Sequence, residues 1–150
     1  LEDALPADIP AIKPTPATAV DELLNRHLVL VYTGRARLAK NLLQRVLRGW
    51  ALRDNVAGVV QRIVANTEAL AQALVRGDIS ETGRLMSVSW ELKKIMAPGA
   101  EPPEVTDLLE VLREADKLEG ASLCGAGGGG FLALLVKRKE GDGGAVESVR

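Results

Sequence analysis

The sequence predicts an α+β domain in which about four helices cover a small sheet. Apolar residues recur at the spacing i, i+3, i+4 in four segments between residues 39 and 112, which indicates amphipathic helices. Two short apolar runs, Leu28–Tyr32 and Phe131–Val136, have the length and composition of buried strands. A third strand is expected at 121–124. Because a sheet of three strands has an open edge, the fold is expected to be truncated.

The two ends of the chain are expected to lie outside the domain. Pro6, Pro10, Pro14 and Pro16 fix φ and remove backbone donors, so residues 1–26 are interpreted as a Pro-rich linker or arm. Residues 27–139 form the predicted domain. Residues 140–150 are Gly-rich and then faintly helical, as in a flexible tail or the start of a truncated final helix. Since the chain begins with leucine, it is expected to be a fragment or a processed product.

The first two helices are expected at 39–50 and 56–74. Gly77 fits the C-terminal stop of the second, because glycine readily takes the left-handed conformation that ends helices. The basic residues of the first helix lie mainly opposite its apolar face. That segment belongs to a stretch, 26–53, with seven basic and no acidic residues. Such a stretch is either a solvated helix face or a local anion site.

The third and fourth helices carry recognisable end signals. Asp78 can cap the third helix, and Glu81 completes a pattern like a capping box. Pro98 and Gly99 end that helix. The fourth helix opens at Pro102-Pro103, where a missing N–H costs little, and Gly120 is expected to end it.

Composition narrows the functional classes. At 47% hydrophobic and 26% charged residues the chain is globular, and its net charge of −1 favours neither nucleic acid nor a membrane. Its one cysteine excludes an internal disulfide. No apolar run approaches the roughly 18 residues of a membrane span, and no signal peptide is visible. We therefore expect a cytoplasmic protein.

The strongest functional signal is a run of glycines, here called the glycine loop. Its residues are Gly125, Ala126, Gly127, Gly128, Gly129 and Gly130. So many glycines cost backbone entropy and fit places where φ is positive or a ligand comes close. Successive amides in such a backbone form an anion-binding nest. A flexible surface turn is the ordinary alternative, but the apolar strands on both sides favour a substrate or ATP-phosphate loop.

The common phosphate-binding loops do not fit these surroundings. Gly125, Gly127 and Gly130 satisfy the spacing G-x-G-x-x-G, but a Rossmann site needs a following helix, and a strand follows here. A P-loop needs Gly-Lys-Ser or Gly-Lys-Thr. A protein kinase needs a catalytic lobe downstream, and only 20 residues follow Gly130.

Four blocks, in order, resemble the C-terminal half of GHMP-family sugar kinases. The glycine block, LCGAGGGGF at 123–131, is similar to the third, C-terminal motif of that family. The blocks VLVYTGRARLA at 29–39 and SWELKK at 89–94 resemble L-fucokinases and heptose-phosphate kinases. The block MAPGAEP at 96–102 resembles fucokinases in particular. The resemblance covers about residues 27–139.

The resemblance implies a ferredoxin-like C-terminal domain and ATP-dependent phosphorylation of L-fucose at its anomeric hydroxyl, in fucose salvage towards GDP-fucose. It also implies that the main ATP loop, P-x-G-x-G-x-x-S-S, and the catalytic acid lie in an N-terminal domain. Neither is found in this sequence. ATP and Mg²⁺ would be bound mainly by that domain, the expected partner of this chain. The fragment alone is expected to be inactive, with its glycine loop donating amides near the transferred phosphate or the sugar.

Weaker candidates for anion or substrate contacts lie outside the loop. Thr33, Gly34, Arg35 and Arg37 follow the first strand and open a helix, where they could reach an anion. Lys93 lies one helical turn beyond Trp90. The ordinary alternative for all of these is solvated surface, and Trp90 itself is expected in the core rather than beneath a sugar.

Three further residues are expected to be structural. His27 is the only histidine, and no metal-ligand cluster accompanies it. Cys124 is expected to be a small buried side chain. Ser122 lacks the histidine and aspartate partners of a hydrolase triad.

Two alternatives remain open. A heptose-phosphate kinase shares the YTG-like block and the glycine block, and the block at 96–102 favours a fucokinase instead. A non-catalytic module could use the basic helix to bind an anion, nucleic acid or a protein. Two observations count against that module. Only 3% of residues are aromatic, so few side chains could stack on nucleic-acid bases. Such a module would also leave the glycine loop unexplained.

Overall fold

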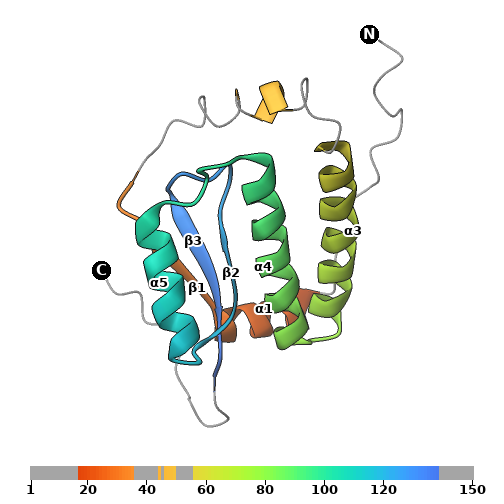
Figure 1. Cartoon of the computed structure of the whole chain (residues 1–150). Coiled ribbons are helices and arrows are strands. Elements are labelled where there is room, and N and C mark those ends of the chain that lie inside the picture. The colour runs from red at the N-terminus through yellow and green to blue at the C-terminus, as the bar shows by residue number, and fades with distance from the viewer. Residues whose placement is uncertain (1–16, 36–43, 45, 50–55, 139–150) are drawn as a thin grey trace.

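A computed structural model describes residues 17–35, 44, 46–49 and 56–138 (Figure 1). Three antiparallel strands in this part of the chain form one sheet in the order β1-β3-β2. Helices α4 and α5 cover one face of the sheet, and α3 packs on the side of α4 away from α5 (Figure 1). The elements are α1 (Ala17–His27), β1 (Leu28–Tyr32), α3 (Val56–Val75), α4 (Ile79–Met96), α5 (Pro103–Glu114), β2 (Leu118–Leu123) and β3 (Phe131–Val136).

The predicted helices are confirmed where the structure describes them. Helices α3, α4 and α5 lie where the apolar spacing placed them, and Gly77 ends α3 with a φ of 73°. The helix expected at 39–50 falls mostly outside the described residues; residues 44 and 46–49 are helical. The chain also forms helix α1, of which all but the last residue lies in the stretch 1–26 interpreted as a linker or arm. Its last residue, His27, has Nδ1 2.9 Å from the carbonyl oxygen of Val136, which accepts its hydrogen bond.

Strand β2 begins earlier than the sequence indicated. Gly120, expected to end a helix, lies inside β2, next to an irregularity in the pairing with β3. The reason is a close approach between β2 and α4. A Cβ atom at Gly83 of α4 would lie 2.5 Å from the carbonyl carbon of Glu119, and one at Gly120 would overlap the backbone of Gly83. Glycine therefore serves here to let a helix touch a strand.

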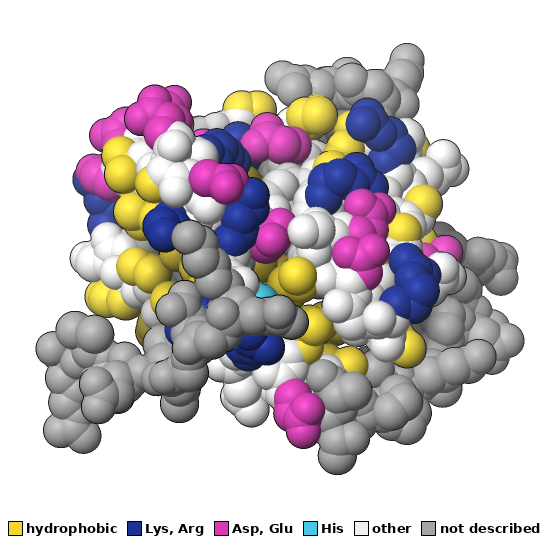
Figure 2. Space-filling view, turned by 90° about the horizontal axis from the view of Figure 1, so that it is seen from below, with side chains coloured by type: hydrophobic (Ala, Val, Ile, Leu, Met, Phe, Trp, Pro, Cys, Tyr) yellow, Lys and Arg dark blue, Asp and Glu magenta, His cyan; other side chains and the backbone are white. Residues whose placement is uncertain are grey.

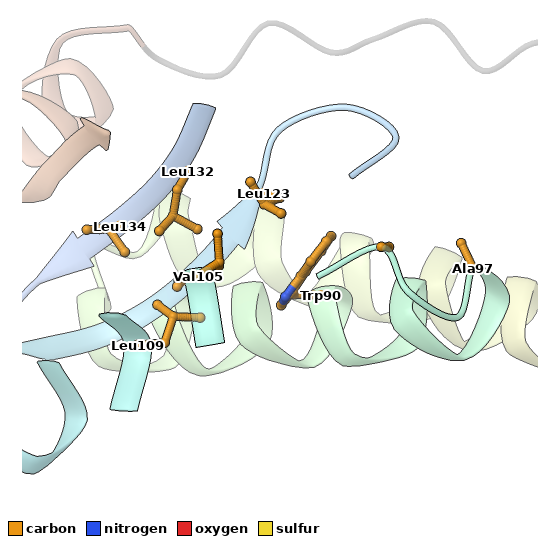
Figure 3. Packing of buried hydrophobic residues seen from close by; sticks show 9 residues of the cluster. Trp90, Ala97, Val105, Leu109, Leu123, Leu132 and Leu134 are labelled. Atoms are coloured by element: carbon orange, nitrogen blue, oxygen red, sulfur yellow. The ribbon is translucent and has the colours of Figure 1, made fainter. Parts of the chain in front are cut away.

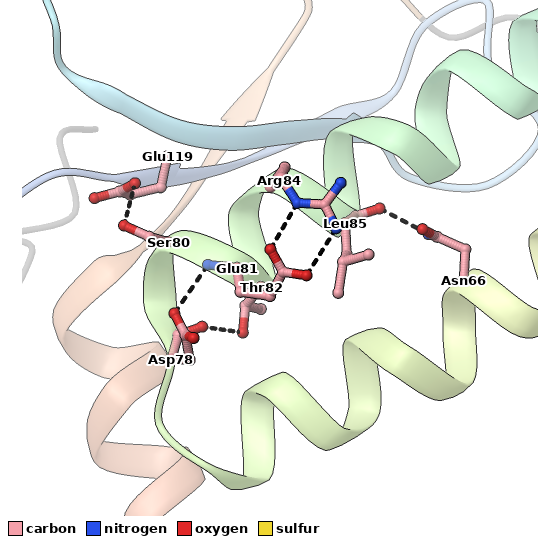
Figure 4. Close-up of polar contacts among 8 residues, drawn as sticks. All are labelled: Asn66, Asp78, Ser80, Glu81, Thr82, Arg84, Leu85 and Glu119. Carbon is pink, nitrogen blue, oxygen red and sulfur yellow. Dashed lines mark hydrogen bonds and ion pairs between the residues drawn. The ribbon is translucent and has the colours of Figure 1, made fainter.

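The start of α4 is held by side-chain bonds, as Figure 4 shows. Asp78 accepts a 3.0 Å bond from the amide of Glu81, which confirms the predicted cap. The reciprocal bond of a capping box does not form. The amide of Asp78 donates instead to Ala73, and the Glu81 carboxylate binds Arg84 at 2.6 Å.

The polar contacts between α3 and α4 are equally specific. Asn66 of α3 donates to the carbonyl oxygen of Leu85 at 2.8 Å and to the Ser89 hydroxyl at 2.7 Å. Asn66 thus ties the middle of α3 to α4, and Figure 4 shows its bond to Leu85.

The apolar core lies between the sheet and helices α4 and α5. Trp90 is 1% exposed and lies between Leu123 and Ala97, at the end of the core where β2 leads into the glycine loop (Figure 3). Its predicted place in the core is confirmed. Burying each leucine of this cluster contributes about 1.5–3 kcal/mol. The buried cluster contains Trp90, Ala97, Ala100, Val105, Leu109, Ala121, Leu123, Leu132 and Leu134.

No helix among the described residues combines the length and apolarity needed to cross a bilayer.

Candidate functional site: the glycine loop

The glycine loop joins β2 to β3, and its neck is closed by a 2.8 Å bond from the Cys124 amide to the Phe131 carbonyl oxygen. Every glycine in it has positive φ, from 76° at Gly125 to 145° at Gly129. Residues with a Cβ atom are strained in that region, so the backbone path itself requires glycine.

The inner part of the loop packs tightly against its own chain. A Cβ atom at Gly127 would lie 2.9 Å from the Cβ of Ala100 and 3.3 Å from the Trp90 ring. One at Gly129 would lie 2.6 Å from the carbonyl oxygen of Arg35. These two glycines are therefore needed for internal packing, whether or not a ligand binds.

Two amides of the inner part are already used. The Gly128 amide donates to the Ala100 carbonyl oxygen at 2.6 Å, and the Gly130 amide donates to that of Arg35 at 2.8 Å. In the part of the chain that the structure describes, the amides of Gly125, Ala126, Gly127 and Gly129 donate to no backbone acceptor. Gly127 and Gly129 are buried, so the amides of Gly125 and Ala126 are the loop donors that an anion could reach.

The tip of the loop is open to solvent. Gly125 and Ala126 are exposed, and a Cβ atom at Gly125 would meet nothing within 4 Å. Cys124 beside them is also exposed, so the expectation that it is buried is wrong. Its side chain faces away from the core because Leu123, the preceding residue of the strand, faces into it. The tip is thus the part of the loop that a ligand can reach.

Three of the weaker candidates lie beside the loop. Both the amide and the hydroxyl of Thr33 donate to the Gly130 carbonyl oxygen at 2.9 Å. Gly34 follows with a φ of 72°, and the Arg35 carbonyl oxygen accepts from Gly130 as above. The Arg35 guanidinium forms an exposed ion pair with Glu104 in the first turn of α5. The structure therefore brings the end of β1 and the glycine loop together.

The remaining candidates are less closely placed. Lys93 lies on α4 one turn beyond Trp90, and its side chain has no polar partner among the described residues. Arg37 lies outside the described residues. The side chain of Ser122 bonds only locally, to the Leu123 carbonyl oxygen at 3.3 Å.

Glu101 is a site residue that the residue patterns did not single out. It accepts hydrogen bonds from Trp90 Nε1 and, at 3.0 Å, from Thr106 Oγ1, and Lys94 Nζ lies 3.4 Å away. Burial opposes ionisation of this carboxyl, but these bonds and the lysine charge outweigh it and hold its pKa below the ordinary value. Because Glu101 lies between α4 and α5, no helical or strand period could reveal it, and the sequence showed it only as one residue of the MAPGAEP block.

These groups suit a phosphate better than a metal ion. Amides at the loop tip and one arginine beside the loop are donors of the kind that bind phosphate oxygens. Among residues 17–35, 44, 46–49 and 56–138, no three His, Cys, Asp or Glu side chains gather in a way that could hold a metal. We assign no Mg²⁺ ligand to this part of the chain.

Comparison with known proteins agrees with the fold. A family profile described as GHMP kinases C terminal matches residues 70–150. The crystal structure of L. major mevalonate kinase in complex with R-mevalonate superposes with a TM-score of 0.66 at 21% identity, covering 76% of this chain and 34% of that one. That likeness concerns the fold alone.

Two relatives are similar in sequence. The chain is 32% identical over 110 residues to L-fucokinase/L-fucose-1-P guanylyltransferase from Bacteroides fragilis. It is 32% identical over 118 residues to the bifunctional fucokinase/GDP-fucose pyrophosphorylase from Arabidopsis thaliana. The alignments cover 73% and 78% of this chain, which spans 11% of the length of each relative. Since the family profile matches more than half of the chain, the chain belongs to the GHMP kinases and forms their C-terminal domain, with the α+β architecture that the sequence predicted.

Proposed function

We propose that this domain is part of an ATP-dependent sugar kinase that phosphorylates L-fucose at its anomeric hydroxyl. The observation that carries the proposal is the exposed tip of the glycine loop in a GHMP C-terminal domain. At this tip the amides of Gly125 and Ala126 donate to no backbone acceptor among the described residues. The choice of L-fucose is supported by the two relatives, whose names are those of fucokinases.

The chemistry proposed for this chain is positioning and charge stabilisation. Phosphoryl transfer spreads negative charge over the oxygens of the transferred group, and most of the catalysis consists of holding and neutralising them. The tip amides would donate to those oxygens or to the sugar, and Arg35 would add a positive charge once released from Glu104. ATP supplies the phosphoryl group and Mg²⁺ neutralises its charge.

Other parts of the machinery are proposed to lie in a partner domain. We expect the complete gene product to contain a P-x-G-x-G-x-x-S-S loop and a catalytic acid, because this chain has neither and its relatives are much longer. The 150-residue chain by itself is then inactive. A location in the cytoplasm remains a prediction from the sequence.

The test is a kinase assay on the complete gene product. Purified protein is given ATP, Mg²⁺ and one sugar at a time, and ADP release is followed by a coupled assay. L-fucose should stimulate ADP release, and phosphorus NMR should show a sugar 1-phosphate. Turnover of a heptose phosphate but not of L-fucose would support the heptose-phosphate kinase instead. No sugar-dependent turnover would contradict the proposal.

A polyanion-binding module is less well supported. Basic and acidic side chains are interspersed over the face shown in Figure 2, so that face does not present one sign of charge. Salt-dependent retention of the protein on a polyanion column, without sugar kinase activity, would favour this second reading.

A further inference from the structure

Glu101 forms a polar junction between two helices. Its side chain is only 13% exposed. Trp90 and Lys94, which bind it, belong to α4, whereas Thr106 belongs to α5. A carboxylate so far out of water is tolerated only when donors surround it, and here the donors come from both helices. Glu101 therefore fixes these side chains relative to one another.

The same junction supports the glycine loop. The Trp90 ring lies under Gly127, where a Cβ atom would come within 3.3 Å of it. Ala100, the residue before Glu101, accepts the 2.6 Å hydrogen bond from the Gly128 amide. One of these contacts is made by Trp90, which donates to Glu101, and the other by the residue that precedes Glu101 in the chain.

A purely structural role would not require a carboxylate. Replacing a buried charge and its partners by well-packed apolar side chains is often neutral or stabilising. An apolar side chain at position 101 could not accept a hydrogen bond from the indole N–H of Trp90. It therefore could not determine which edge of the ring lies under Gly127. The polar junction is better explained by a need for a defined position of the loop.

We propose that Glu101 is a positioning residue: by holding Trp90 and the peptide at Ala100, it fixes the glycine loop so that the tip amides point at a ligand. The positioning is a property of the fold. Its consequence for catalysis rests on the proposed kinase function.

Hydrogen exchange in the complete gene product tests the positioning without any activity. The variant Glu101→Gln keeps the size of the side chain but removes its charge. Exchange in the peptide that covers residues 124–131 should become about tenfold faster, because a hydrogen bond to a charged group is replaced by a weaker neutral one. Trp90→Phe keeps an aromatic ring but removes the N–H donor, and should speed exchange in the same peptide.

The matched control is Glu81→Gln, which likewise replaces a charged acceptor by a neutral one, in the pair of Glu81 with Arg84 near the other end of α4. It should leave exchange in the loop peptide unchanged. Exchange in the loop peptide of the double variant Glu101→Gln/Trp90→Phe should be less than twofold faster than in the faster single variant, because both changes act on the same hydrogen bond between Trp90 and Glu101.

Two outcomes would overturn the proposal. One is loop exchange that stays at the wild-type rate in both single variants. The other is exchange that rises equally in the loop and in the β3 peptide, since that pattern reports a general loss of stability. If Glu101→Gln does not fold, Trp90→Phe decides by the same criterion. Absence of kinase activity in the wild-type protein would refute the proposed function and leave this result intact. If activity is present, Glu101→Gln should lower kcat.

Discussion

The amide of Gly128 donates a 2.6 Å hydrogen bond to the carbonyl oxygen of Ala100, and this bond ties the glycine loop to the turn between α4 and α5. It divides the loop into two functional parts. From Gly127 to Gly130 the backbone is held by its own chain, whereas Gly125 and Ala126 are exposed. Substitutions in the two parts should therefore have different effects on stability and on activity.

Gly120→Ala should destabilise the domain by about 3 kcal/mol, the upper end of the usual cost of overpacking. The added methyl group would overlap the backbone of Gly83, and a helix and a strand must separate to admit it. Urea unfolding followed by circular dichroism measures the change.

Gly58→Ala is the control for that experiment. Gly58 lies in α3, and a Cβ atom there would meet nothing within 4 Å. Alanine should stabilise the helix by about 0.5–1 kcal/mol. If both variants changed stability alike, the close approach of Gly83 and Gly120 would not be the cause.

The stability of the domain should fall as the pH drops below about 4.5, the ordinary pKa of a glutamate, partly because of Glu101. Its pKa is lower in the folded than in the unfolded state. The charged form therefore stabilises the fold above the unfolded pKa, and that contribution disappears as the pH falls through the folded pKa. The urea concentration at the unfolding midpoint should change less between about pH 5 and pH 3 in Glu101→Gln than in wild type, because the variant lacks this titrating carboxyl. An equal slope in both proteins would contradict the assigned pKa shift.

Arg35→Gln should lower kinase activity by about tenfold or more while changing stability little. The ion pair of Arg35 with Glu104 is exposed, and such pairs contribute about 0–1 kcal/mol. A hydrogen bond from Arg35 to a phosphate would contribute more. Glu104→Gln breaks the same ion pair but leaves the guanidinium free, so its activity should not fall. Equal activity losses in the two variants would argue against a contact between Arg35 and the ligand.

Much of the fold could be predicted from local patterns. The apolar spacing of α3, α4 and α5 and the cap at Asp78 are signals within one or two helical turns. The start of β2 could not be predicted, because Gly120 serves a contact with Gly83, 37 positions earlier in the chain. Helix α1 was missed because the nearby prolines suggested a linker throughout.

The site was predictable only in part, for a similar reason. Positive φ along the loop follows from its glycines, and the structure confirms it. Which amides are free depends on Ala100 and Arg35, whose carbonyl oxygens are distant in sequence. The junction at Glu101 depends on Trp90 and Thr106 in two different helices. No pattern within one element contains that information.

Gly125→Ala should leave the domain folded and yet damage catalysis, which separates a ligand loop from a surface turn. Gly125 has a φ of 76° and no atom within 4 Å of an added Cβ, so alanine costs only the backbone strain of about 1–2 kcal/mol. Gly77, with a φ of 73° and equally open space, is a matched control at the end of α3. Both variants should lose similar stability in urea unfolding.

Only Gly125→Ala should also lose L-fucose-dependent ADP release in the complete gene product. If the tip amides donate to the transferred phosphate, displacing them should cost about 10²–10³ in kcat, the effect of losing one preorganised donor in a transition state. The methyl group would also occupy space that the structure leaves open to a ligand. Gly77→Ala introduces a similar backbone strain outside the glycine loop, so any loss of its kinase activity reflects reduced stability alone. The ratio of the kinase activity of Gly125→Ala to that of Gly77→Ala therefore measures the contribution of the loop tip to catalysis. A ratio near one would mean that the tip is a turn whose glycines serve only the backbone path between β2 and β3.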